Sequence, residues 1–105
     1  MTINKKPGFY ARKKDKNHNE IADGLRGDGH YVVDTHKQGE GFPDVLVIPS
    51  GCQFPCLLEI KMPGEGLTDK EDEFWTQYPG VVFIVHTLEE AREFIDKYSQ
   101  ICRRT

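Results

Sequence analysis

The chain has 105 residues, of which 37% are hydrophobic and 30% charged, and its formal net charge is -3. This composition predicts one folded domain with a modest core and excludes a disordered chain. No run of about eighteen apolar residues occurs, and no apolar stretch follows the N-terminal lysines. We therefore expect neither a membrane span nor a signal peptide, and a cytoplasmic location.

The three cysteines, Cys52, Cys56 and Cys102, do not predict a disulfide framework, because their number is odd and no secretion signal precedes them. The C-x-x-x-C spacing of Cys52 and Cys56 is compatible with zinc. A structural zinc site needs a second pair of ligands, however, and the four histidines are scattered along the sequence. We interpret Cys52 as a loop residue and Cys56 as a strand residue.

Charge is distributed unevenly along the chain. Residues 1–16 carry six basic side chains against one acidic one, a charge of +5, and the other residues carry 8 basic and 16 acidic side chains, a charge of -8. Because Pro7-Gly8 interrupts any helical periodicity, we predict an extended basic arm over residues 1–16 and a folded domain over residues 17–105. The arm could contact phosphates, with Lys13, Lys14 and Lys16 as candidates, or be a solvated tail.

The first predicted helix begins near Asn17, which has the spacing of a capping box with Glu20, and ends at Gly27–Gly29. Residues 31–33 are predicted as a short strand, and residues 35–43 as a polar loop. The apolar runs 45–48 and 56–60 are predicted as buried strands. The turn residues between them favour an antiparallel hairpin.

The second predicted helix begins at Thr68, where Glu71 completes a capping box, and Phe74 and Trp75 would supply its core-facing side. Residues 81–85 form the most strand-like run. A final helix follows Thr87, with apolar residues at helical spacing: Leu88, Ala91, Phe94, Ile95 and Tyr98. The order αβββαβα predicts an α/β fold, a mixed sheet flanked by helices in which the strands at 56–60 and 81–85 run parallel.

Charged residues interrupt the hairpin at one end. Asp44 precedes its first strand, and Glu59 and Lys61 end its second strand, on one face and about 6–7 Å apart because side chains alternate. A turn near Gly51 or Cys52 would bring Asp44 beside them. Two adjacent carboxylates resist ionising unless a cation lies between them, and oxygen ligands suit Mg²⁺.

This arrangement suits phosphodiester hydrolysis. The cation would polarise the phosphate and acidify a water. Lys61 would orient or deprotonate that water, or stabilise the charge on phosphorus. We also expect the backbone carbonyl of Ile60 among the metal ligands, and His36 and Lys37 in the preceding loop as phosphate contacts. The simpler alternative is a surface ion pair between Glu59 and Lys61.

The segments Gly41-Phe42-Pro43-Asp44 and Leu57-Leu58-Glu59-Ile60-Lys61 resemble the signature of the PD-(D/E)XK nucleases. The resemblance covers about residues 17–86 and is greatest to small VRR-NUC and Holliday-junction-resolvase-like members from phages and bacteria. It implies a restriction-endonuclease-like core, Mg²⁺ or Mn²⁺, a DNA substrate that could be branched, and a bacterial or phage-infected host cell. By position, Asp44 and Glu59 would be metal ligands and Lys61 the catalytic lysine.

Two further positions follow from the resemblance. Members of the family commonly add a glutamate from the first helix, and Glu20 matches it as a catalytic residue and metal ligand. Where VRR-NUC-like members usually carry a glutamine in the helix after the E-x-K strand, this chain has Glu71, which cannot donate hydrogen bonds as an amide does. Capping Thr68 is the simpler role for Glu71.

The sequence therefore predicts a metal-dependent DNA endonuclease without an organic cofactor or a membrane partner. The alternatives are a non-catalytic nucleic-acid-binding module with the same fold and a small protein-interaction domain with an acidic surface. Because 105 residues offer little surface to grip DNA, we also expect a homodimer. Its interface would use the last helix, with Phe94, Ile95 and Tyr98, or the first helix and the following strand.

Overall fold

The computed structural model describes the backbone of residues 7–104 and the side chains of residues 13–102. Its elements, in chain order, are α1 (Pro7–Gly27), β1 (Tyr31–Asp34), the 3-10 turn η1 (His36–Gln38), β2 (Val45–Ile48), β3 (Cys56–Ile60), α2 (Asp69–Gln77), β4 (Val82–Val85) and α3 (Leu88–Arg104). The predicted order αβββαβα is confirmed. None of the described helices combines the length and the apolar character needed to cross a membrane.

Helix α1 begins ten residues earlier than predicted. The extended conformation expected for residues 7–16 is wrong, and the rest of the predicted arm, residues 1–6, lies outside the described residues. Proline is well tolerated at a first helical position, so Pro7 starts the helix instead of breaking it. Asn17 consequently lies inside α1 and caps nothing with Glu20. Its side-chain amide donates to the carbonyl of His86, 2.9 Å away.

The four strands form one mixed sheet in the order β1-β2-β3-β4. Strand β2 is antiparallel to both neighbours, and β4 is parallel to β3, as the crossover through α2 predicted. In the β2–β3 hairpin Val47 pairs with Cys56 and Val45 with Leu58, so the hairpin is centred between Gly51 and Cys52. The predicted position of this turn is confirmed.

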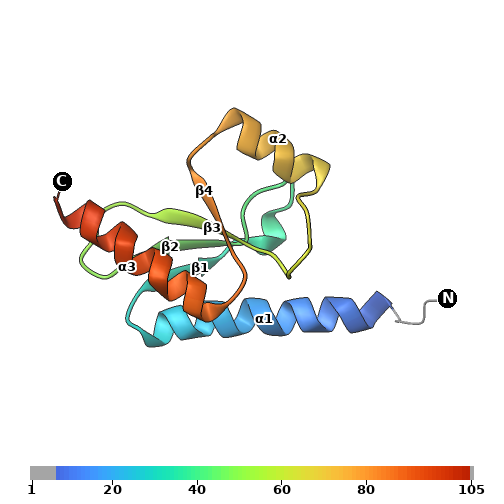
Figure 1. Ribbon diagram of the computed structural model, residues 1–105, viewed down its shortest axis with the longest axis horizontal. Helices are drawn as coiled ribbons and strands as arrows, with labels where there is room; N and C mark the ends of the chain where they lie inside the picture. The colour runs from blue at the N-terminus through green and yellow to red at the C-terminus, as the bar shows by residue number, and fades with distance from the viewer. Residues whose placement is uncertain (1–6, 105) are drawn as a thin grey trace.

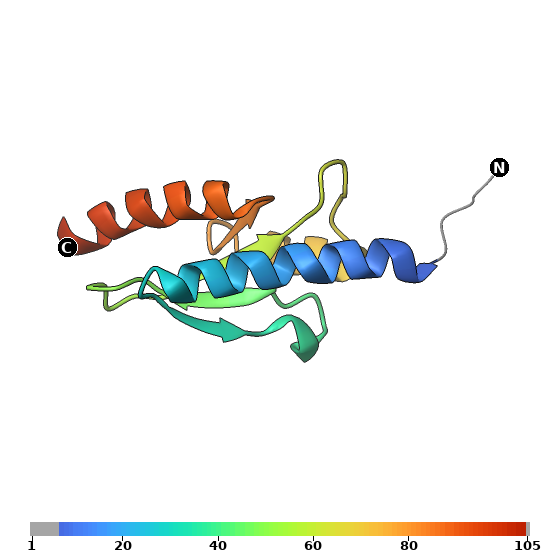
Figure 2. The ribbon, with the colours of Figure 1, turned by 90° about the horizontal axis from the view of Figure 1, so that it is seen from below.

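The core lies on the face of the sheet that α1 and α3 cover together (Figures 1 and 2). Alternating residues of the two central strands point to it and are at most 1% exposed: Val45, Val47, Leu58 and Ile60. The helices contribute Ile21 and Leu25 from α1 and Ala91 and Ile95 from α3, with Phe94 and Tyr98 packed against the cluster. The apolar stripe of α3 is therefore used inside the protomer.

Helix α2 lies on the other side of the sheet from α1 (Figure 1). The prediction that Phe74 and Trp75 pack into the core is wrong, because no residue of α2 is buried. Phe74 packs edge-on against Phe42 instead, with ring centroids 5.6 Å apart. Helix α2 thus supports the loop that leads to Asp44.

Gly41 brings this loop into close contact with the first turn of α2. Its φ is +76°, a left-handed conformation that strongly favours glycine. A Cβ atom added at Gly41 would lie 2.2 Å from the backbone carbonyl oxygen of Lys70. Because that oxygen belongs to the helix backbone, a side chain at Gly41 must displace the loop.

We predict that Gly41→Ala destabilises the fold more than Gly80→Ala. Gly80 also has a positive φ, +81°, but a Cβ there would meet nothing within 4 Å, so only Gly41→Ala adds a clash with the backbone of α2. Both variants carry the strain of a positive φ, about 1–2 kcal/mol. Urea unfolding would show the larger loss for Gly41→Ala, and equal losses would contradict the close contact.

Candidate active site

Asp44 and Glu59 lie opposite each other at one end of the β2–β3 hairpin. The register that pairs Val45 with Leu58 continues by one residue, and the backbone N–H of Asp44 donates to the carbonyl of Leu58 at 3.1 Å. One carboxylate oxygen of Asp44, Oδ2, accepts the backbone N–H of Ile60 at 2.8 Å. The hairpin therefore holds Asp44 against the E-x-K end of β3, as the sequence predicted.

Thr35 fixes the backbone on the other side of Asp44. Its N–H donates to the carbonyl of Asp44 at 2.9 Å, and its hydroxyl donates to the carbonyl of Pro43 at 2.7 Å. Thr35 is only 8% exposed, so both bonds are shielded from water. Asp44 thus stands on a backbone that is bonded to both neighbouring strands.

Glu59 is 1% exposed, and its Oε2 is buried without a hydrogen-bond partner among the described residues. Burial, and then the nearby carboxylates of Asp44 and Glu71, raise the pKa of Glu59 to about 9, although Lys61 opposes the shift. A buried polar atom left without a partner costs about 1–3 kcal/mol. Such an atom is therefore a place where a ligand can bind favourably.

Lys61 is also 1% exposed, so the surface ion pair considered above is wrong. Its ammonium lies 2.5 Å from Glu71 Oε1, 3.5 Å from Glu59 Oε2 and 3.6 Å from Glu65 Oε2. Burial acts to lower the pKa of Lys61, but these carboxylates outweigh it and raise the pKa. The lysine is held as a buried cation.

Glu71 caps α2, as the simpler interpretation predicted, and also contacts Lys61. It completes the capping box of α2, because its Oε1 accepts the N–H of Thr68 at 2.8 Å, and the same oxygen accepts from the ammonium of Lys61. Burial opposes ionisation, but these hydrogen bonds lower the pKa of Glu71 to about 2. Helix α2 therefore places a permanent negative charge beside the lysine.

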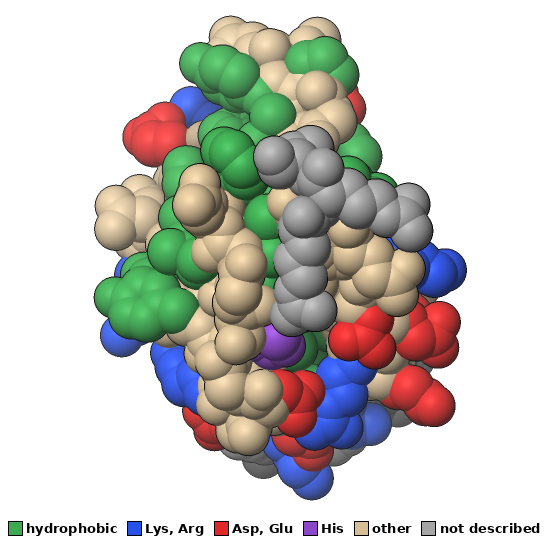
Figure 3. Space-filling view, turned by 90° about the vertical axis from the view of Figure 1, so that its left-hand side faces the viewer, with side chains coloured by type: hydrophobic (Ala, Val, Ile, Leu, Met, Phe, Trp, Pro, Cys, Tyr) green, Lys and Arg blue, Asp and Glu red, His purple; other side chains and the backbone are tan. Residues whose placement is uncertain are grey.

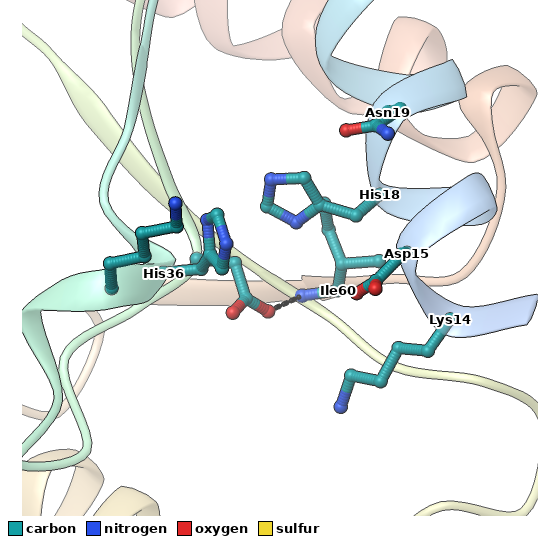
Figure 4. A pocket seen from close by; sticks show the side chains of 8 residues that line it. Lys14, Asp15, His18, Asn19, His36 and Ile60 are labelled. Carbon is teal, nitrogen blue, oxygen red and sulfur yellow. Dashed lines mark hydrogen bonds between the residues drawn. The ribbon is translucent and has the colours of Figure 1, made fainter. Parts of the chain in front are cut away.

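A pocket of about 270 Å³ opens beside Asp44, between α1, η1 and the end of β3 (Figure 4). The dashed line in Figure 4 is the bond from the N–H of Ile60 to Asp44. Three of the predicted phosphate contacts, Lys14, His36 and Lys37, line this pocket. Lys13 and Lys16 do not line it and lie along a neighbouring hollow beside Met62 and His86.

Glu20 is not among the residues that line the pocket, and it is exposed. The buried stripe of α1 runs through His18 and Ile21, and Glu20 is about 200° around the helix from His18. The acidic side chain that α1 does present to the pocket is Asp15 (Figure 4). Sequence reasoning missed Asp15 because its segment was assigned to an extended arm.

No protein-family model matches this chain, and neither the curated proteins nor the solved structures yield a match.

We predict that, in EDTA, the stability of the wild type falls relative to Glu59→Gln as the pH rises from 5 to 9. Because folding raises the pKa of Glu59 from 4.5 to about 9, the stabilisation that its protonated form provides is complete below pH 4.5 and is lost as the pH rises through about 9. Glutamine does not titrate. Thermal melts of both proteins, with exposed Glu20→Gln as the control, measure the difference, and parallel pH curves for the wild type and Glu59→Gln would contradict it.

Proposed function

We propose that this chain is a divalent-metal-dependent DNA endonuclease of the PD-(D/E)XK type, with a restriction-endonuclease-like core. The observation that carries the proposal is the buried Oε2 of Glu59, directly across the hairpin from Asp44, which accepts no hydrogen bond from the described residues and has the Lys61 ammonium 3.5 Å away. A buried carboxylate oxygen that accepts no hydrogen bond, next to a second carboxylate, suits a bound cation better than it suits an apolar core.

The residues present fit Mg²⁺ or Mn²⁺. Asp44 and Glu59 offer carboxylate oxygens, and the backbone carbonyl of Ile60 stays in the proposed ligand set because Ile60 lines the pocket with Asp44. Glu59 and Lys61 do not line this pocket and lie buried beside it. Asp15 replaces Glu20 as the candidate from α1. The bound ion would supply Lewis-acid activation of a phosphodiester and of an attacking water.

Residues of the chain would stabilise the transition state and bind the DNA. Lys61, kept cationic by Glu71, would stabilise the charge that develops on phosphorus and orient the water by donating hydrogen bonds. That arrangement argues against Lys61 as the base. Lys14 and Lys37 would bind the neighbouring DNA phosphates, because both line the pocket from opposite sides, α1 and η1.

The alternative is a nucleic-acid-binding module that keeps this fold without catalysis. Replacement of a central site residue would favour that alternative, but Asp44, Glu59 and Lys61 are all present and lie together. The central carboxylates and the lysine thus favour the enzyme. The substrate that we propose is DNA, including branched forms.

We also propose a homodimer, but not through the predicted apolar stripe of α3, because Ile95 is 1% exposed within the protomer core. The first helix with β1 remains as the proposed interface, since β1 is an edge strand and carries Tyr31 at 64% exposure. Apolar side chains also gather in the upper half of the end of the molecule at the left of Figure 1, where α3 ends, and Ile101 near the end of α3 is 63% exposed (Figure 3).

We predict that Asp44→Asn binds Mn²⁺ at least about 10-fold more weakly than the wild type, since it removes a charged ligand. The asparagine carbonyl can still accept the N–H of Ile60, so the fold should be kept. In EDTA the variant should be about as stable as the wild type near neutral pH, where the raised pKa keeps Glu59 protonated, and more stable above about pH 9, where carboxylate repulsion is relieved. Calorimetric titration with Mn²⁺ is the measurement, with melts in EDTA as the control. Equal Mn²⁺ affinities would contradict the assignment.

We predict that the wild type nicks supercoiled plasmid and cleaves a four-way DNA junction with Mn²⁺ but not in EDTA. Asp15→Asn should lower the rate by about 10–100-fold, the usual cost of disturbing a metal site. Glu20→Gln, five residues along the same helix but outside the pocket, should cleave at the wild-type rate. If Glu20→Gln cleaved more slowly than Asp15→Asn, Glu20 would be the site residue instead. If the wild type showed no metal-dependent cleavage, the result would favour the non-catalytic binding module.

A further inference from the structure

Three side chains from different elements meet beside the pocket, and two of them, His18 and His36, line it. His18 comes from α1, Asp34 ends β1, and His36 begins η1. Asp34 Oδ1 lies 2.6 Å from His18 Nε2 and 2.7 Å from His36 Nδ1, and all three atoms lie within 4.8 Å of one another. The two imidazole rings are 4.7 Å apart between centroids and tilted by 57°. One carboxylate oxygen therefore binds two imidazole nitrogens at once.

We propose that His18, Asp34 and His36 form a Zn²⁺ site with one coordination position open to the pocket. Two imidazole nitrogens and one carboxylate oxygen are a set that zinc favours and Mg²⁺ does not. This site shares no ligand with Asp44 and Glu59. It therefore stands or falls independently of the nuclease proposal.

Side-chain adjustments would be needed to hold the ion. Ligands of tetrahedral zinc, about 2.0–2.1 Å from the metal, are roughly 3.3 Å apart. The two nitrogen–oxygen distances are 2.6 and 2.7 Å, so Asp34 would move away from each ring by about 0.6–0.7 Å. The two nitrogens, which lie within 4.8 Å of each other, would settle at the same spacing, and the ion would replace the two shared protons. His36 can follow because its side chain is 39% exposed.

The surroundings fix His18, keep Asp34 charged and leave access for a fourth ligand. His18 is 7% exposed and fixed on α1, whereas the side chain of Asp34 is 34% exposed. Burial acts to raise the pKa of Asp34, but hydrogen bonds from His36 and His18 outweigh it and lower the pKa, so the carboxylate is charged. His18 and His36 line the pocket together with Lys14 (Figure 4). The open position would take water or a phosphate oxygen.

The thiols of this chain are competing zinc ligands, and none of them belongs to the cluster. Cys56 is 3% exposed, and burial raises the pKa of its thiol to about 12, which disfavours the thiolate that binds metal. Cys52 and Cys102 are partly exposed. A double variant, Cys52→Ser with Cys102→Ser, therefore removes the accessible thiols.

The test is calorimetric titration of the full chain with Zn²⁺, repeated with Co²⁺ so that tetrahedral coordination is seen as visible absorption. We expect one ion per chain in the wild type, in the double cysteine variant and in Asp44→Asn. His36→Ala should weaken Zn²⁺ binding at least about 10-fold and remove the Co²⁺ bands, since a direct ligand is lost. His36→Ala should still bind Mn²⁺ at the other site.

The partly exposed position of His36 makes His36→Ala the variant least disturbing to the fold, and a thermal melt checks it. Equal Zn²⁺ affinity in His36→Ala and the wild type would overturn the site. The site would also be overturned if the double cysteine variant lost Zn²⁺ binding while His36→Ala kept it. A wild type that binds no Zn²⁺ would also overturn the site and leave the cluster as two histidines hydrogen-bonded to Asp34.

Discussion

The register of the β2–β3 hairpin is the constraint on which the candidate active site depends. Because the hairpin is centred between Gly51 and Cys52, Asp44 lies opposite Glu59. A shift of one residue would turn the side chains of one strand to the other face and separate these carboxylates. The same register buries Val45 and Leu58 against α1 and α3. One pairing of strands therefore both buries the core residues and brings the site carboxylates together.

That arrangement buries charge at a cost. Glu59 and Lys61 are both 1% exposed, and Oε2 of Glu59 accepts no hydrogen bond within the described part of the chain, although the Lys61 ammonium lies 3.5 Å away. Glu71 and Glu65 contribute carboxylates from outside the sheet, and Lys14 links Glu65 to α1 at 2.5 Å. Buried ionic groups of this kind are costly for stability and are retained where they serve a function.

Much of the site could be predicted from the sequence because it depends on local rules. Alternation along β3 places Glu59 and Lys61 on one face, and the turn residues near Gly51 locate the hairpin centre. The start of α1 could not be predicted, because Pro7 can either break or begin a helix. Because residues 7–16 were expected to be extended, Glu20 and not Asp15 was chosen as the site residue from the first helix.

The cluster of His18, Asp34 and His36 was beyond sequence reasoning for a different reason. Asp34 and His36 are two residues apart, but His18 reaches them only through the packing of α1 on β1. Likewise, no residue of α2 is buried, so helical spacing alone could not place Trp75. Contacts between distant elements decided both cases.

The central claim is that a divalent cation binds between Asp44 and Glu59. A crystal structure of the wild type grown with Mn²⁺ tests it most directly, because anomalous scattering locates the ion without assumptions about its ligands. This account predicts a peak at inner-sphere distance, about 2.0–2.3 Å, from oxygens of both carboxylates. Full Mn²⁺ occupancy elsewhere on the protein, with Glu59 Oε2 still lacking a partner, would contradict it.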